Sequence, residues 1–272
     1  IQTANITNDF DTVNTKFGEV FGEKAEKPFV RQGMKFGKYE DESNQFNGFY
    51  YVDYGYYPQS LATDIDVSNL ITTTGETFTI NNTPYDVYEY NSKQYIKYNT
   101  STSDTTQVAY EVEPVRWLIL GYGDETAIAE NEISVENGVL NLTNETKKSK
   151  GLLVLSEKVL VQQIFSAGTT LYNNWENSPI REFMNGIFIN DIFRKGESSL
   201  IKNTTLYTTY NTGSEILEML TTTDKLFLLS CSPKDLDDSM YMSDNYQVKR
   251  GLKSDTDLCE YNRELYTQLQ AK

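Results

Sequence analysis

From residue 49 onward, the apolar positions follow a strand-like pattern. Residues 49–55 are packed with aromatic side chains and are followed by Pro58, which predicts a strand that ends before the proline. Shorter runs predict strands at 77–80, 85–90, 94–98 and 115–120, and Asn91-Ser92-Lys93 predicts a hairpin connection. The apolar runs 151–155 and 225–230 predict two further buried strands.

Helical spacing is clearest after Ser178. Pro179 fits the first turn of a helix, where its missing N–H is harmless. One apolar stripe then follows at Ile180, Phe183, Met184, Ile187 and Phe188. Gly186 is expected to divide this helix, with further short helices near 190–193 and from Ser198. Another helix is expected at 157–165, capped by Ser156.

The first 48 residues differ from the rest of the chain. Phe10, Val13, Phe17, Val20 and Phe21 share one face of a possible helix, and residues 33–47 are charged and loop-like. The pattern predicts an N-terminal appendage, or the remnant of a preceding region, at 1–48. Residues 49–272 are predicted to form an α+β domain that is mixed and strand-rich, with a few short helices.

Charge limits the partners that this surface attracts. The 24 Lys and Arg residues against 39 Asp and Glu residues give a net charge of -15. Nucleic acid and anionic membranes would be repelled over most of the surface. The longest apolar runs, such as 226–229, are far shorter than the roughly 20 residues of a membrane-spanning helix, so no membrane span is expected.

The chain contains no histidine. Triads that depend on histidine are therefore excluded, and so are zinc sites that contain it. Residues 64–68 begin like a calcium loop, but Asn69 and Gly75 stand where that loop needs Gly and Glu. The acidic group Asp235, Asp237 and Asp238 could hold calcium in another geometry, but it is more typical of a solvated helix start. No catalytic residue, metal ligand or cofactor is expected, and the sequence does not identify ligand-binding residues.

The two cysteines, Cys231 and Cys259, leave an open alternative. They could form one disulfide or stay as two small buried apolar groups, because the sequence does not show whether their Cα atoms approach closely enough.

Five blocks of sequence resemble, in order, an uncharacterised domain family of bacterial surface proteins, the domain of unknown function 6273. They lie at 51–60 (YVDYGYYPQS), 112–117 (VEPVRW), 152–158 (LLVLSEK), 175–186 (WENSPIREFMNG) and 224–230 (DKLFLLS). The family is distantly similar to C-type-lectin-like and sulfatase-modifying-enzyme folds. The resemblance implies a C-type-lectin-like domain that is extracellular or at the cell surface. It also implies that further strands would follow Lys272, so the fold is expected to be truncated at its C-terminus.

Structural roles are expected for the large aromatic residues of these blocks, Trp117, Trp175, Phe183 and Phe227, because packed cores use such residues. The leading functional hypothesis is a non-catalytic binding or adhesion module with a glycan or protein ligand, since Tyr-rich loops supply rigid contact area. The alternatives are a carboxylate-based glycan hydrolase and a structural spacer domain.

Overall fold

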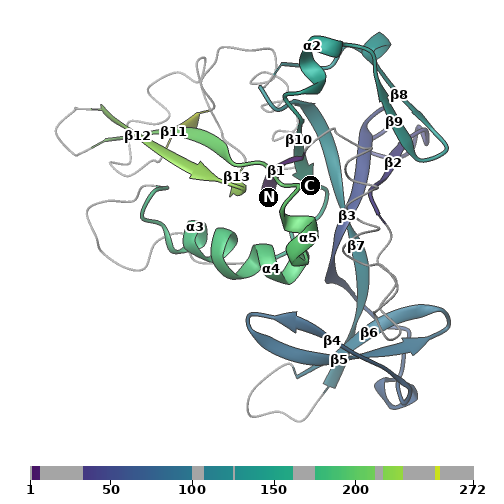
Figure 1. Cartoon of the computed structure of the whole chain (residues 1–272). Coiled ribbons are helices and arrows are strands. Elements are labelled where there is room, and N and C mark those ends of the chain that lie inside the picture. The colour runs from purple at the N-terminus through teal and green to yellow at the C-terminus, as the bar shows by residue number, and fades with distance from the viewer. Residues whose placement is uncertain are drawn as a thin grey trace.

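The computed structural model describes residues 33–99, 107–124, 126–161, 175–211 and 217–228, together with the short strands at 2–6 and 249–251 (Figure 1). The expected helix over 10–21, the acidic group at 235–238 and both cysteines lie outside these described residues.

The described strands are β1 (Gln2–Ile6), β2 (Lys35–Lys38), β3 (Tyr50–Leu61), β4 (Thr73–Ile80), β5 (Thr83–Tyr90), β6 (Lys93–Asn99), β7 (Gln107–Tyr122), β8 (Ile133–Glu136), β9 (Val139–Leu142), β10 (Leu152–Ser156), β11 (Thr204–Asn211), β12 (Leu217–Asp224), β13 (Leu226–Leu228) and β14 (Lys249–Gly251). The described helices are η1 (Val67–Asn69), η2 (Glu130–Glu132), α2 (Glu145–Lys148), α3 (Pro179–Phe183), η3 (Met184–Phe188), α4 (Ile189–Ile192) and α5 (Lys195–Ser198).

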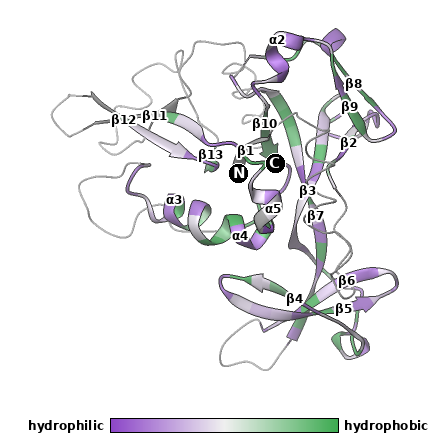
Figure 2. Cartoon of the chain, viewed as in Figure 1, coloured by the Kyte–Doolittle hydropathy of each residue, from purple (hydrophilic) through white to green (hydrophobic). Residues whose placement is uncertain are grey.

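Nine strands form one antiparallel sheet that curls into a half-barrel. The strand order is β13-β1-β10-β7-β6-β5-β4, and β3 pairs with β7 and with β2. Helices α3 to α5 lie beside the long β3–β7 pair (Figure 1). The protein is therefore strand-rich with a few short helices, as the sequence predicts. Hydrophobic residues concentrate in β10 and the adjoining part of β7, whereas much of the β5–β6 hairpin is hydrophilic (Figure 2).

Three hairpins have two-residue turns in the left-handed region. The turns are Asn81-Asn82, Asn91-Ser92 and Asn137-Gly138, and all six residues have a positive φ. Type I′ turns need this conformation, which Asn and Gly adopt at the lowest cost. The Asn91-Ser92 turn confirms the predicted hairpin, whereas the hairpin of β8 and β9 falls in a polar segment for which the sequence predicted no strands.

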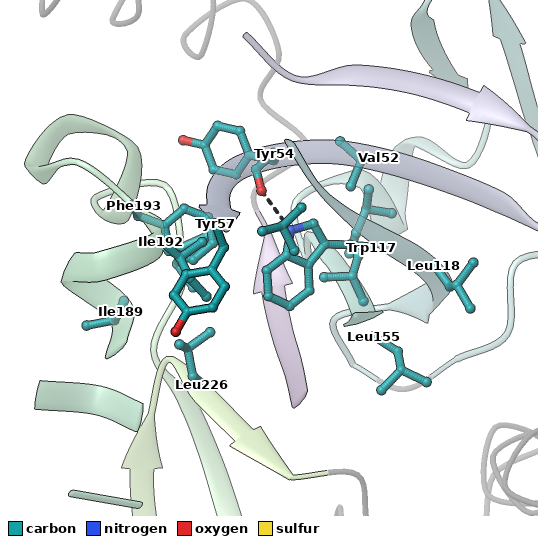
Figure 3. Close-up of a cluster of buried hydrophobic side chains, with 14 of the residues drawn as sticks. Val52, Tyr54, Tyr57, Trp117, Leu118, Leu155, Ile189, Ile192, Phe193 and Leu226 are labelled. Carbon is teal, nitrogen blue, oxygen red and sulfur yellow. Dashed lines mark hydrogen bonds between the residues drawn. The ribbon is translucent and has the colours of Figure 1, made fainter. Parts of the chain in front are cut away.

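The core centres on the indole of Trp117, which is fully buried. Its Nε1 donates a hydrogen bond to the carbonyl oxygen of Tyr54 at 2.8 Å (Figure 3). The ring of Phe193 lies between Trp117 and Tyr54, with centroid distances of 6.0 and 5.4 Å. The Tyr54 hydroxyl donates to the carbonyl of Glu197, and this bond ties the end of the helical region to β3. Trp117, Trp175, Phe183 and Phe227 all contribute to this core, as expected.

Strand β3 continues through Pro58 to Leu61, so the prediction that it ends before the proline is wrong. Strand β2 pairs with β3 only at residues 50–53, so Pro58 lies where β3 has β7 as its one strand neighbour among the described residues. A proline is tolerated there because no second neighbouring strand needs its N–H. The register also shifts between Pro58 and Ser60, which is a usual place for a proline within a strand.

Three helix predictions are wrong in part. Residues 157–161 are not helical, because the backbone N–H of Glu157 donates to the carbonyl of Arg116 and prolongs the pairing of β10 with β7. Residues 162–165 are outside the described part of the chain. Gly186 does not divide the second helix, since the chain stays helical through the π-helical turn η3. The third short helix, α5, ends at Ser198 and does not begin there.

The predicted helix start at Ser178 is confirmed. The Ser178 side chain accepts a hydrogen bond from the N–H of Arg181, and Pro179 occupies the first turn. The first 48 residues also contribute to the sheet, because β1 pairs with β10 and β13, and β2 pairs with β3. Phe36 and Phe46 are buried in the main core. Residues 33–48 thus pack on the domain that follows, and a domain boundary at residue 48 stays a prediction.

Gly55 is the point where the helices meet the sheet. It lies at a register shift of β3 with φ of +74°, and an added Cβ would lie 2.6 Å from Ile192 and 2.7 Å from Phe193. Replacing Gly55 with Ala should therefore cost about 1–2 kcal/mol for the left-handed conformation. The forced movement of the helix should cost about 1–3 kcal/mol more. Urea denaturation measures the sum.

Gly75 is the matched control for that substitution. It has φ of +80° and also lies at a register shift, in β4, but an added Cβ would meet no atom within 4 Å. Gly75→Ala should show the conformational cost alone. Equal losses for the two variants would show that helix contact at Gly55 is unimportant.

A buried carboxylate joins the helices to the β4–β5 hairpin. Asp191 of α4 is 4% exposed, and its Oδ2 accepts a hydrogen bond of 2.8 Å from the backbone N–H of Asn81 in the hairpin turn. Burial raises the pKa of Asp191, and the bond from Asn81 opposes that rise. Asp191 therefore favours folding when it is protonated, and this contribution is lost as pH rises through the raised pKa.

We expect Asp191→Asn to be close to the wild type in stability near pH 4 and increasingly more stable as pH rises to 7. The amide keeps an oxygen for the Asn81 N–H and has no charge to bury. Urea titrations at several pH values measure the difference. Asp86→Asn, at an exposed position of β5, corrects for the change in net charge. A difference between Asp191→Asn and wild type that is independent of pH would contradict the assignment.

Candidate ligand-binding groove

A stretch of β7 has no strand on one of its edges. Strand β3 pairs with β7 from Tyr110 to Leu118, β6 pairs with it from Gln107 to Glu111, and β10 pairs with it from Trp117 to Tyr122. A strand residue can pair with only one strand on each of its two edges. The β6 and β10 pairings each overlap the β3 pairing at one end, so β6 and β10 both lie on the edge of β7 opposite β3. Residues 112–116 form the interval between them, where β7 has no strand on that edge among the described residues.

An open groove of about 610 Å³ lies at this interval. Its volume is within the range of about 300–1,000 Å³ that is common for small-molecule sites. The described residues that line it are Tyr39, Asp53, Tyr56 and Gln59, then Ser92, Lys93 and Gln94 at the start of β6, then Glu111, Val112, Glu113, Pro114 and Arg116 of β7, and finally Glu157 and Lys158 after β10.

Arg116 and Asp53 make the central ion pair of the groove. They face each other across β7 and β3, and Arg116 donates from Nε and Nη2 to the two carboxylate oxygens at 2.6 and 2.8 Å. The guanidinium carbon lies 3.9 Å from the centroid of the Tyr51 ring, and Nη1 donates to the Tyr39 hydroxyl at 3.0 Å. The hydrogen bonds to Asp53 raise the pKa of Arg116, burial opposes that rise, and the bond to Tyr39 adds to it. The Asp53 pair and the Tyr51 ring also fix the orientation of the guanidinium.

Tyr39 connects this ion pair to the end of β10. Burial raises the pKa of its hydroxyl, the hydrogen bond from Arg116 opposes that rise, and the nearby Glu157 carboxylate adds to it. The phenol therefore stays neutral at physiological pH. It interacts with both a cation, Arg116, and an anion, Glu157.

The outer charges of the groove are also paired. Lys93 Nζ lies 2.8 Å from Glu111, and Lys158 Nζ lies 3.6 Å from Glu113. Glu113 also accepts a hydrogen bond from the Ser60 hydroxyl at 2.6 Å. The side chains of both lysines are about half exposed, so these outer pairs are weak and a ligand can rearrange them.

The five sequence blocks gather at two places. Parts of the blocks at 51–60, 112–117 and 152–158 line the groove. The blocks at 175–186 and 224–230 meet instead around Asp224, which is 2% exposed and accepts hydrogen bonds from Trp175 Nε1, Arg181 Nε and Thr222 Oγ1. Every polar partner in this second cluster is satisfied. The Asp224 cluster therefore has a structural role, and the groove is the candidate ligand-binding site.

The remaining sequence candidates have structural roles where they are described. The Asp66 side chain accepts from the N–H of Ser68 and caps η1, and this bond lowers the pKa of Asp66. Within the described ranges, no group of three or more acidic or cysteine side chains is placed to hold a metal ion. No helix in the described part of the chain is long and apolar enough to cross a bilayer.

The sequence alone identified no ligand-binding residue, so none of the residues that line the groove was predicted. The signal that could have found them is the alternation of charge and aromatic side chains in the blocks at 51–60 and 112–117. Asp53, Glu111, Glu113 and Arg116 interrupt strands that are otherwise apolar or aromatic. Charged residues inside a strand need partners across it, so these positions were candidates for one shared site.

The fold and the groove define a strand-rich α+β domain with a polar, open cleft between two strands, β6 and β10, that share one edge of β7. Residues 149–267 match the family described as Domain of unknown function (DUF6273), which confirms the resemblance over less than half of the chain. Three of the five blocks lie inside the matched range, and the blocks at 51–60 and 112–117 lie outside it. Neither the curated proteins nor the solved structures provided a match.

We expect Arg116→Lys to lower the free energy of unfolding by about 1–2 kcal/mol, because an ammonium cannot make the two parallel bonds to Asp53 or stack on Tyr51. Lys93→Ala, which removes an exposed pair of the same groove, should leave stability unchanged. Thermal and urea denaturation measure both variants. Equal stability of Arg116→Lys and wild type would show that the central pair is not a rigid part of the groove.

Proposed function

We propose that this protein is a non-catalytic binding or adhesion module whose ligand occupies the groove along residues 112–116 of β7. The observation that supports it is the set of paired charges on the groove walls. Asp53, Glu111 and Glu113 are each held by a cation, and Glu157 lies next to the Tyr39 hydroxyl. The central Arg116–Asp53 pair is organised before a ligand arrives, which reduces the entropic cost of binding, and the weaker outer pairs can adjust to the ligand.

A carboxylate-based glycan hydrolase is the competing function, since four carboxylates line an open groove. A hydrolase of this kind needs one acid that delivers a proton to the leaving oxygen. Freeing Asp53, Glu111 or Glu113 for that role would break an ion pair. Glu157 is the one described groove carboxylate without a cation partner, and a hydrolase needs two acids, so the arrangement favours binding over catalysis.

The cellular setting of the proposal comes from the sequence resemblance. We place the module in a bacterial surface or secreted protein, where glycans and host or neighbouring proteins are the available ligands. A C-type-lectin-like relationship is part of the same proposal and rests on the five blocks alone. The groove is lined mainly by strands, so ligand recognition would use the sheet edge more than long loops.

Filling the groove should abolish binding. We expect wild-type protein to give signals on a glycan array or on a panel of purified surface proteins, and Lys158→Trp to lose them, because the indole would occupy the groove. Lys150→Trp, an exposed position outside the groove lining, is the matched control and should bind like the wild type. Circular dichroism checks that both variants are folded.

Two results would count against the proposal. Blank arrays with folded wild-type protein would favour a spacer domain. Hydrolysis of an arrayed glycan that is lost in Glu113→Gln or Glu157→Gln would favour the hydrolase.

A further inference from the structure

Three of the four carboxylates among the described lining residues are paired with a cation, and the fourth, Glu157, lies by the neutral Tyr39 hydroxyl. Lys93, Arg116 and Lys158 face Glu111, Asp53 and Glu113, respectively, and Glu157 lies by Tyr39. An anionic ligand would have to displace a carboxylate from one of these cations, in a chain of net charge -15. Among these described residues, a cationic ligand would find only Glu157 without a cation, and it would have to displace a lysine or arginine to reach any of the other three carboxylates. An uncharged ligand breaks none of these pairs.

Strand addition is also disfavoured at this edge. Pro114 lies in the middle of the uncovered interval and has no N–H to donate to an added peptide strand. The carbonyl oxygens of Glu113 and Pro114 already accept hydrogen bonds from Gln59 Nε2 at 3.3 and 2.9 Å. An extended peptide would find few backbone groups available here, so recognition must depend on side chains.

Gln94 has hydrogen-bonding capacity that the protein does not use. It lies at the start of β6 on the groove wall, and its Oε1 is buried without a hydrogen-bond partner. A buried acceptor without a partner is unfavourable. Rotation of the terminal amide exchanges its oxygen and nitrogen at little steric cost. A ligand in the groove can reach only the end of the amide that is not buried, which is a donor or an acceptor according to this rotation, so a ligand group that both donates and accepts would pair with it in either case.

We infer that the groove binds an uncharged saccharide and that the Gln94 amide is one of the groups that select it. Sugar hydroxyls both donate and accept, as this amide requires. The apolar face of a sugar ring can pack on the partly exposed ring of Tyr39, which also lines the groove. This inference rests on the proposed binding function and specifies its ligand class.

The test titrates the full chain with named tetramers by isothermal titration calorimetry. Cellotetraose, mannotetraose and chitotetraose are the neutral probes, tetragalacturonate is the anionic probe, and tetralysine is the cationic peptide probe. We expect binding to at least one neutral tetramer and none to the charged probes.

Gln94→Met then tests the amide. The variant should bind that neutral tetramer about 3- to 10-fold more weakly, which is the usual loss for one hydrogen bond. Its melting temperature should stay equal or rise, because an unpaired buried acceptor is removed. Gln107→Met is the matched control, on β7 but outside the groove, and should bind like the wild type.

Binding of tetralysine or tetragalacturonate without any neutral tetramer would overturn the saccharide assignment. The saccharide assignment would also be overturned if no tetramer bound, or if Gln94→Met bound the neutral tetramer with unchanged affinity. If Lys158→Trp still abolishes capture of a purified protein when one of these results is found, the binding function is supported and only the saccharide class is rejected. If Lys158→Trp changes binding on no array, both the binding function and the ligand class are rejected.

Discussion

The pairing of β7 with three other strands is the constraint on which this structure depends. One edge of β7 carries β3, and the opposite edge is divided between β6 and β10. On one face, this arrangement places Trp117 in the core under Phe193. It also sets Arg116 against Asp53, and this pair lines the groove. Adjacent residues of one strand therefore serve folding and the candidate site, because successive side chains of a strand point to opposite faces.

The division of that edge explains why the groove exists. Strands β6 and β10 are each too short to cover β7 alone, and a connection of many residues separates them in the chain. Five residues of β7 are left between them, with carboxylates and cations on the surrounding elements. An exposed strand edge invites uncontrolled pairing, and proteins protect such edges with proline and charge. Pro114, Glu113 and Lys158 give this edge that protection while they also line a cleft.

Sequence patterns predicted the parts of the fold that depend on local chemistry. The aromatic run before Pro58 and the Ser178-Pro179 helix start correspond to β3 and α3, because propensity and capping act over a few residues. The Asn137-Gly138 hairpin was missed although Asn-Gly is a strong turn signal, since the polar residues around it hid the alternation of β8 and β9. The helix expected after Ser156 does not form at residues 157–161, because the backbone N–H of Glu157 donates to the carbonyl of Arg116, which is distant in the chain.

Local sequence patterns could not have located the groove, because the groove depends on which residues of different strands lie opposite each other. Asp53 and Arg116 are 63 positions apart, and only the alignment of β3 with β7 makes them partners. Gln94 joins them only because β6 begins where it does on the β7 edge. What the sequence does contain is the composition of the site, in the form of charged residues inside otherwise aromatic strands. Because each of those charges is paired with a charge from another segment of the chain, the paired surface points to recognition of a ligand that brings hydrogen bonds and ring faces, and no charge of its own.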